Sequence, residues 1–189
     1  GSDKVQGSTT KNYFGYGTGL RYLFFDPLAV KISYEHSVRL PIARELLGNG
    51  TTIYANVALE PEKSNNVNLA LFGTWHLAGR HTVYYEANGF LRHVDNYIQT
   101  SVIEKEGMMQ FVNDPAVHIK GVEGEIRYDW DGRLQLMANV SYQDARDQQK
   151  YKEDGKPSAT YDNHVPNRPW LFGSAEASYT FRNFLQQDN

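Results

Sequence analysis

Long segments in which apolar and polar residues alternate one by one constrain the fold of this chain most. Successive side chains of a β-strand point to opposite faces, so a period of two predicts strands. In VKISYEHSVR, Val30 and Ile32 lie on one predicted face and Lys31 on the other. Lys31, Glu35 and Arg39 also recur every fourth residue, as on a helix face. The β-branched residues and the flanking prolines favour the strand.

The same alternation predicts seven strands. They span residues 16–24, 30–39, 66–77, 83–92, 122–130, 133–142 and 171–182. Every Asp, Glu, Lys and Arg within these segments lies on the polar face, and none interrupts the apolar set. A membrane-spanning strand needs about 9 to 11 residues, whereas strands of soluble proteins average about 5 to 6. The predicted strands have the longer size.

The connections between the predicted strands alternate between short and long. Short turns are expected at 26–27, 77–81 and 129–133, and long polar loops at 40–63, 93–116 and 144–167. Aromatic residues gather near the short turns, namely Phe24, Trp75, Tyr128, Trp130, Tyr179 and Phe181. Short periplasmic turns, long extracellular loops and an aromatic girdle are typical of outer-membrane barrels. We therefore expect an all-β fold of antiparallel up-and-down strands, forming part of a transmembrane β-barrel.

Composition excludes several other classes of protein. The net charge of −3 is dispersed along the chain, which argues against a nucleic-acid partner. The chain contains no cysteine, which excludes disulfides, thiolate metal sites and a cysteine nucleophile. Gly1-Ser2 is typical of an expression-tag remnant, so we expect residues 3–189 to form a partial barrel domain.

Several sequence motifs resemble those of a known family. The most specific is the series R-x-P, E-L, N and L-x-P-E-x-S-x-N, formed by Arg39, Pro41, Glu45, Leu46, Asn56, Leu59, Pro61, Glu62, Ser64 and Asn66. It is followed by G-V-E at 121–123 and by VPNRPWLFGSAEASYTF. From about Tyr13 to Leu185, the chain resembles the barrel of a TonB-dependent outer-membrane receptor of the kind abundant in Bacteroides-like bacteria.

The resemblance implies a function in the bacterial outer membrane. Such receptors have a barrel of about 22 strands that is closed by a plug. The inner-membrane protein TonB pulls on the plug to admit a scarce nutrient such as a ferric siderophore or cobalamin. The plug and its TonB-contacting box are missing from this sequence, so we expect a fragment that cannot transport alone. It is expected to contact outer-membrane lipid and to self-associate through unpaired strand edges.

Seven residues at or near the long predicted loops are candidate ligand contacts. They are Arg39, Arg44, Arg92, Tyr97, Arg146, Arg168 and Trp170. Cationic and aromatic side chains suit the anionic and aromatic groups of a siderophore, although loop solvation also explains them. No metal or cofactor is expected. The six histidines lack ligand spacing, and the glycines at 15, 17 and 19 lie in a strand that no helix follows.

Two rival classes remain open from the residues alone. A soluble β-sandwich, such as a carbohydrate-binding or adhesin-like module, would bring two apolar sheet faces together. An outer-membrane enzyme would need a nucleophile and a base on one polar face. Glu123 and Glu125 could pass for a catalytic acid pair, but Arg127 continues their row and favours a solvated barrel wall. We expect no enzymatic activity.

Overall fold

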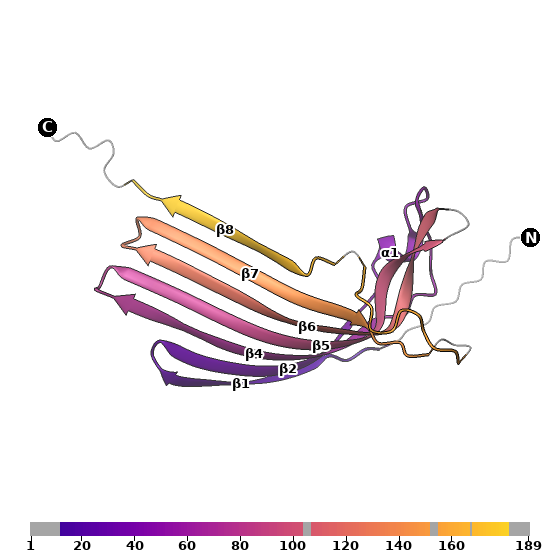
Figure 1. The fold of residues 1–189 in the computed structure, drawn as a ribbon, viewed down its shortest axis with the longest axis horizontal. Coiled ribbons are helices and arrows are strands. Elements are labelled where there is room, and N and C mark those ends of the chain that lie inside the picture. The colour runs from indigo at the N-terminus through magenta and orange to yellow at the C-terminus, as the bar shows by residue number, and fades with distance from the viewer. Residues whose placement is uncertain (1–11, 104–106, 152–154, 167, 182–189) are drawn as a thin grey trace, which may run out of the picture.

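The strands form one curved sheet (Figure 1). The computed structural model describes residues 12–103, 107–151, 155–166 and 168–181. The strands are β1 (Tyr16–Phe25), β2 (Leu28–Arg39), β3 (Ile53–Tyr54), β4 (Glu62–Leu77), β5 (His81–Ile103), β6 (Met108–Trp130), β7 (Leu134–Asp147) and β8 (Leu171–Tyr179). The described residues contain one helix, α1 (Ala43–Leu47), and no helix among them is long and apolar enough to span a bilayer.

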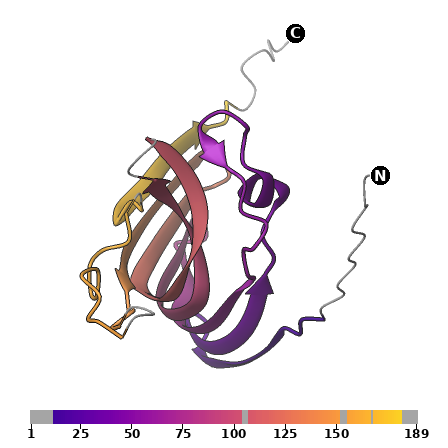
Figure 2. The ribbon, with the colours of Figure 1, turned by 90° about the vertical axis from the view of Figure 1, so that its right-hand side faces the viewer.

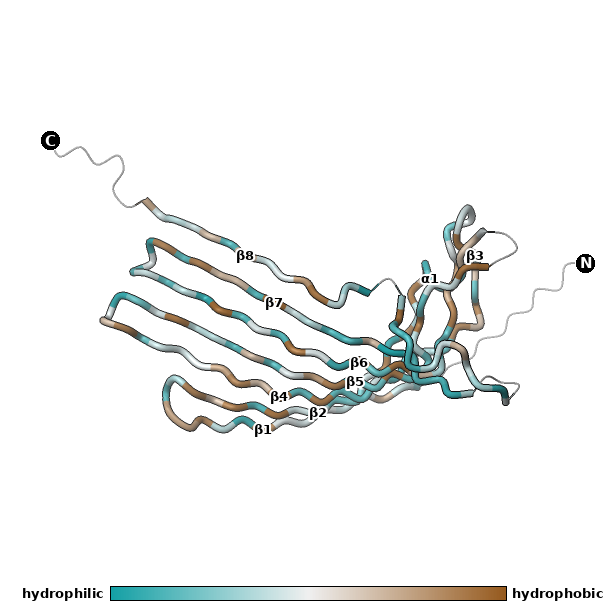
Figure 3. The backbone as a smooth tube through the Cα atoms, viewed as in Figure 1, coloured by the Kyte–Doolittle hydropathy of each residue, from teal (hydrophilic) through white to brown (hydrophobic). Residues whose placement is uncertain are grey.

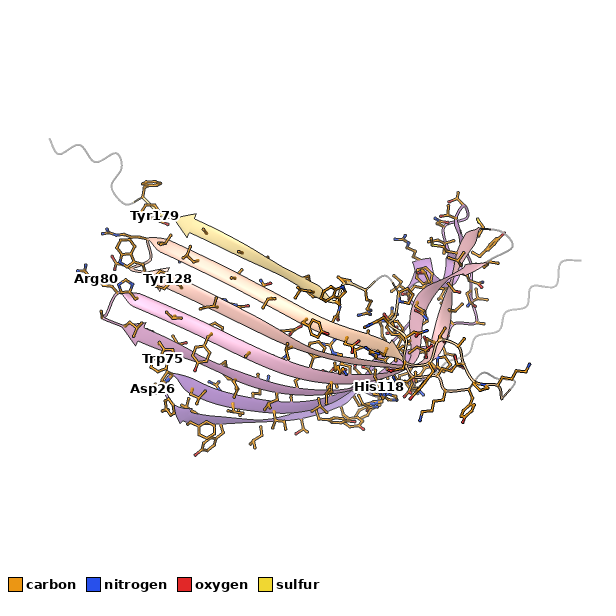
Figure 4. The ribbon with its side chains drawn as sticks, in the orientation of Figure 1. Asp26, Trp75, Arg80, His118, Tyr128 and Tyr179 are labelled. Carbon is orange, nitrogen blue, oxygen red and sulfur yellow. The ribbon has the colours of Figure 1, made fainter. Side chains whose placement is uncertain are left out.

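The seven long strands pair in the order β1-β2-β4-β5-β6-β7-β8, and each pair is antiparallel. The predicted up-and-down arrangement is therefore confirmed, with the short β3 added in parallel to β6. The turns that contain Asp26 and Arg80 lie at one end of the sheet (Figure 4). Trp75, Tyr128 and Tyr179 lie near the same end, where the sequence predicted an aromatic girdle.

The prediction of a long loop over 93–116 is wrong. β5 and β6 are each 23 residues long, and their pairing continues from His81 opposite Trp130 to Ile103 opposite Met108. The outer part of this hairpin turns sharply away from the other strands (Figures 1 and 2). Tyr97 and Ile98 are both buried although they are neighbours in the sequence. Both faces of the hairpin are thus covered at this point, which interrupts the alternation that marked the other strands, whereas Val102 and Met109 nearer the tip are exposed.

The other two predicted loops also contain regular structure. The segment 40–63 includes α1, β3 and the start of β4. β7 continues to Asp147, beyond the predicted start of the last loop. Local hydrogen bonds hold α1, and pairing with β6 holds β3; both elements are too short to show a hydropathy period.

The apolar face of the sheet has no protein layer over it. Leu69, Val122 and Leu136 are 51%, 59% and 41% exposed, and all described strands belong to one sheet. The sandwich alternative is therefore wrong, because it needs a second sheet against these side chains. Hydrophilic and hydrophobic positions alternate along the strands (Figure 3). The polar face lines the hollow side of the curve, where Lys31 and Asn88 lie.

A small apolar core lies where the polar face meets the outer hairpin. Its members are Phe90, Val94, Tyr97, Val117, Ile119, Ala145 and Val165. Val117 has no exposed surface. Phe90 lies opposite Gly121, and a Cβ atom at Gly121 would overlap its ring. Glycine at position 121 therefore leaves room for the Phe90 ring at the base of the outer hairpin.

Candidate functional site

Arg39 joins four segments at the outer end of the sheet. Its Nε and Nη2 atoms donate to Glu62 Oε2 and Oε1 over 2.7 and 2.8 Å, and Nη1 donates to Glu45 Oε1 over 3.0 Å. Glu62 Oε1 also accepts from the Ile98 amide over 2.7 Å, and Glu45 Oε2 accepts from the Ile42 amide over 2.9 Å. We call Arg39, Glu45 and Glu62 the Arg39 network. Hydrogen bonding to Glu62 raises the pKa of Arg39, so the guanidinium stays charged.

Asn113 fixes the loop between β2 and β4 against the outer hairpin. Its Oδ1 accepts from the Glu60 amide over 2.8 Å, and its Nδ2 donates to the Glu60 and Asn96 carbonyls over 2.9 and 2.8 Å. Asn56 Nδ2 donates to the Phe111 carbonyl over 2.8 Å. The loop between β2 and β4 and the outer part of the β5–β6 hairpin therefore form one unit, which we call the extracellular unit.

Asp114 is an ionisable group within this unit. It is 7% exposed, and its Oδ2 accepts from Gln99 Nε2 over 3.0 Å. Its Oδ1 has no hydrogen-bond partner among the described residues. Burial, followed by the charge of nearby Asp147, raises the pKa of Asp114 to about 6, against a smaller opposing effect of a hydrogen bond with the Ala116 backbone.

Tyr97 and Arg168 come together from segments far apart in the sequence. Arg168 Nε donates to the Tyr97 hydroxyl over 2.5 Å, and its guanidinium carbon lies 5.1 Å from the centre of the Tyr97 ring. The contact combines a hydrogen bond with a cation–π interaction. It holds the segment before β8 against the outer hairpin.

The other four residues predicted to contact the ligand lie apart from one another. Arg44 and Arg92 are exposed, and Arg92 lies over the Phe90 ring at 4.9 Å. Arg146 is bound to Asp144 and Asp162, and Trp170 packs edge-on against Tyr142 at 6.3 Å. The seven candidates therefore do not form one cluster. Sequence reasoning missed the roles of Asn113 and Asp114, for which hydropathy carries no signal.

The inner wall presents charged and polar side chains to the hollow of the sheet. Glu123 Oε2 accepts from Asn88 over 3.4 Å, and Glu125 forms an ion pair with Arg127. This pairing agrees with a solvated wall. Within the described ranges, no three histidine, cysteine or acidic side chains are arranged to hold a metal ion.

A sheet of long strands with an uncovered apolar face and a polar hollow is the wall of a transmembrane β-barrel. The model of the family "TonB dependent receptor-like, beta-barrel" matches residues 1–188. The chain therefore belongs to this family, whose members lie in the bacterial outer membrane. In outer-membrane barrels the short turns face the periplasm and the long connections face the exterior.

Solved structures of transporters share this fold. The chain is similar to "Copper transporter OprC", with a TM-score of 0.61 and 21% identity, over 87% of this chain and 24% of that one. It is also similar to "The FrpB iron transporter from Neisseria meningitidis (F3-3 variant)", with a TM-score of 0.53 and 17% identity, over 89% and 24%. The chain thus spans about a quarter of either protein. Comparison with curated proteins gives no match.

Proposed function

We propose that the chain forms part of the wall of a receptor that binds a scarce nutrient at the cell surface and imports it with energy from TonB. The observation that carries this proposal is the arrangement of the two sheet faces. An apolar outer face suits lipid, while a polar hollow beneath an anchored extracellular unit suits a hydrophilic cargo. No bond in the cargo needs to be made or broken, so the proposal contains no catalytic step.

The proposed cargo is a ferric siderophore, cobalamin or a similar small metal complex. The names of the two similar transporters, for copper and for iron, support this class. Arg44 and Arg92 are the first candidates for contacts with an anionic cargo, because both are exposed at the outer end of the sheet. Tyr97 with Arg168, and the exposed Trp170, offer further aromatic and cationic groups. Arg39 is assigned a structural role instead.

Whole-cell uptake tests the proposal. Cells that produce the receptor containing this wall are supplied with labelled ferric siderophores and with labelled cobalamin, with and without functional TonB. We expect uptake of one of these cargoes, lost without TonB and reduced by Arg92→Gln. Asn139→Gln, on the inner wall far from the loops, serves as the matched control. Uptake that is unchanged without TonB contradicts the proposed energy source, and the absence of uptake of every cargo contradicts the nutrient class.

A further inference from the structure

Asp114 and Asp147 are buried carboxylates that lie near each other where the outer hairpin meets the end of β7. Each residue is only 7% exposed. Within the part of the chain that the structure describes, neither carboxylate forms an ion pair with a lysine, arginine or histidine. Buried charges are normally paired or coordinate a metal ion. Two negative charges therefore lie together here without a compensating positive charge from the described residues.

Two buried side-chain oxygens beside this pair also lack a hydrogen-bond donor. Gln99 Nε2 donates to Asp114 Oδ2 over 3.0 Å, which ties these two side chains together. Asp114 Oδ1 and Gln99 Oε1 have no hydrogen-bond partner among the described residues. Turning the Gln99 amide over does not help, because a second oxygen would then face Asp114 Oδ2. The two oxygens are both acceptors, so a proton or a metal ion is needed to satisfy them.

The neighbouring residues orient these oxygens but supply no positive charge to them. Tyr97 lies directly opposite Asp114 in the hairpin, and Arg168 binds the hydroxyl and the ring of Tyr97 instead of the carboxylate. Asp147 lies opposite Val117 at the end of β7. Its Oδ1 accepts from the Gln149 amide over 2.7 Å, which fixes the direction of this carboxylate. The donor atoms are thus held in place from two separate strands.

The chemistry of these donors selects among metal ions. All of them are oxygens, from two carboxylates and one amide, whereas zinc and copper favour nitrogen or sulfur ligands. Calcium takes six to eight oxygen ligands in an irregular arrangement and accepts both carboxylate and amide oxygens, with water completing the set. Magnesium needs a near-ideal octahedron and gives up its water reluctantly. Only two of the side chains are acidic, in agreement with the lack of a group of three histidine, cysteine or acidic residues in the described ranges.

We propose that Asp114, Asp147 and Gln99 bind a calcium ion, and we call these residues the Asp114 site. Asp114 and Gln99 belong to the outer hairpin, and Asp147 ends β7. An ion shared between them would clamp the hairpin to the barrel wall, beside the contact of Tyr97 with Arg168. The proposal is independent of the proposed transport function, because it concerns the stability of the extracellular unit and not the cargo.

Hydrogen exchange with and without calcium tests the site. The receptor containing this wall is purified in detergent and measured at about pH 8, above the pKa of Asp114, so that a proton does not occupy the site. We expect about 10 mM calcium to slow the exchange of residues 97–103 and 107–114 at least about tenfold relative to EDTA, for a dissociation constant of about 1 mM or lower. The same concentration of magnesium should slow exchange less.

Matched variants separate the site from general effects of a divalent ion. Asp114→Asn and Asp147→Asn keep the side-chain volume and should each abolish the effect of calcium. Asp162→Asn changes a 59% exposed aspartate in the segment after β7 and should retain the full effect. An unchanged exchange rate of the wild type in calcium overturns the proposal and leaves a proton as the only occupant. Equal slowing in Asp114→Asn also overturns it, and equal slowing by magnesium overturns the assignment to calcium.

Discussion

Arg39 and Glu62 face each other across β2 and β4 and form a bidentate ion pair, with both hydrogen bonds shorter than 2.9 Å. Glu62 also accepts a hydrogen bond from the Ile98 amide, so the pair links the barrel wall to the outer hairpin. A bidentate pair needs the planar guanidinium, because a lysine ammonium acts as a point charge. The extracellular unit therefore depends on the identity of Arg39 as well as on its charge.

Arg39→Lys should loosen the extracellular unit by about 1 kcal/mol, the size of one lost hydrogen bond to a partly exposed charge. Faster hydrogen exchange at the Ile98 amide measures this effect. Arg44→Lys, on the exposed side of α1, is the matched control and should leave the exchange rate unchanged. Equal exchange in both variants contradicts the role assigned to the bidentate geometry.

The raised pKa of Asp114 predicts that the stability of the outer hairpin depends on pH. Its pKa is about 6 in the folded hairpin and 3.8 as the ordinary value. Between these values the folded state holds a proton that the opened state releases, so stability falls as pH rises through this window. Asp114→Asn should remove the dependence and stabilise the hairpin at neutral pH by up to about 3 kcal/mol.

Hydrogen exchange of residues 97–103 and 107–114 as a function of pH tests this prediction. Asp26→Asn, an exposed aspartate in a turn at the other end of the sheet, is the control. A hairpin whose opening free energy rises between pH 4 and pH 6 would show the opposite sign and exclude the assignment to Asp114.

The outer face predicts a strong penalty for charge near the middle of the membrane. Leu69→Arg should destabilise the folded barrel by roughly 2 to 4 kcal/mol, because its side chain projects into hydrocarbon. Asn68→Arg puts the same charge on the inner face of the neighbouring position and should cost far less. Urea titrations of the protein folded into bilayers compare the two. Similar costs would mean that Leu69 does not face lipid.

Alanine substitutions at Gly73 and Gly89 form a matched pair that tests the packing of the turn between β1 and β2. A Cβ atom at Gly73 would overlap the Pro27 carbonyl, which accepts a hydrogen bond from the Tyr85 hydroxyl. Gly73→Ala should therefore cost about 1 to 3 kcal/mol as the turn is displaced. A Cβ atom at Gly89 meets nothing within 4 Å, so Gly89→Ala should be neutral or slightly stabilising. Urea titration distinguishes them, and equal effects would contradict the turn geometry.

The membrane wall could be predicted from the sequence because each of its strands contacts lipid on one face and a polar space on the other. That setting imposes a strict period of two, which is visible in residues such as Val30, Lys31 and Ile32. The short turns predicted three of the pairings, β1 with β2, β4 with β5 and β6 with β7, since strands joined by a few residues must be antiparallel neighbours. The family motifs pointed to the same architecture, including Arg39 and Glu62.

The extracellular unit could not be predicted from the same signal, because burial along its strands does not alternate between a covered face and an exposed one. Tyr97 and Ile98 are buried side by side, so hydropathy along the hairpin has no period. The unit is held by contacts between distant residues, such as Arg168 with Tyr97 and Asn113 with Glu60.

The sequence alone thus determined the barrel wall, its strand directions and its two faces, because the membrane acts on every strand in the same way. Only the tertiary structure decided which of the candidate residues meet. It assigned Arg39 to the fold, paired Tyr97 with Arg168, and aligned His93, His118 and Arg146 in one row. Such alignments depend on the register between strands, which pairing across the sheet fixes and a pattern within one strand does not contain.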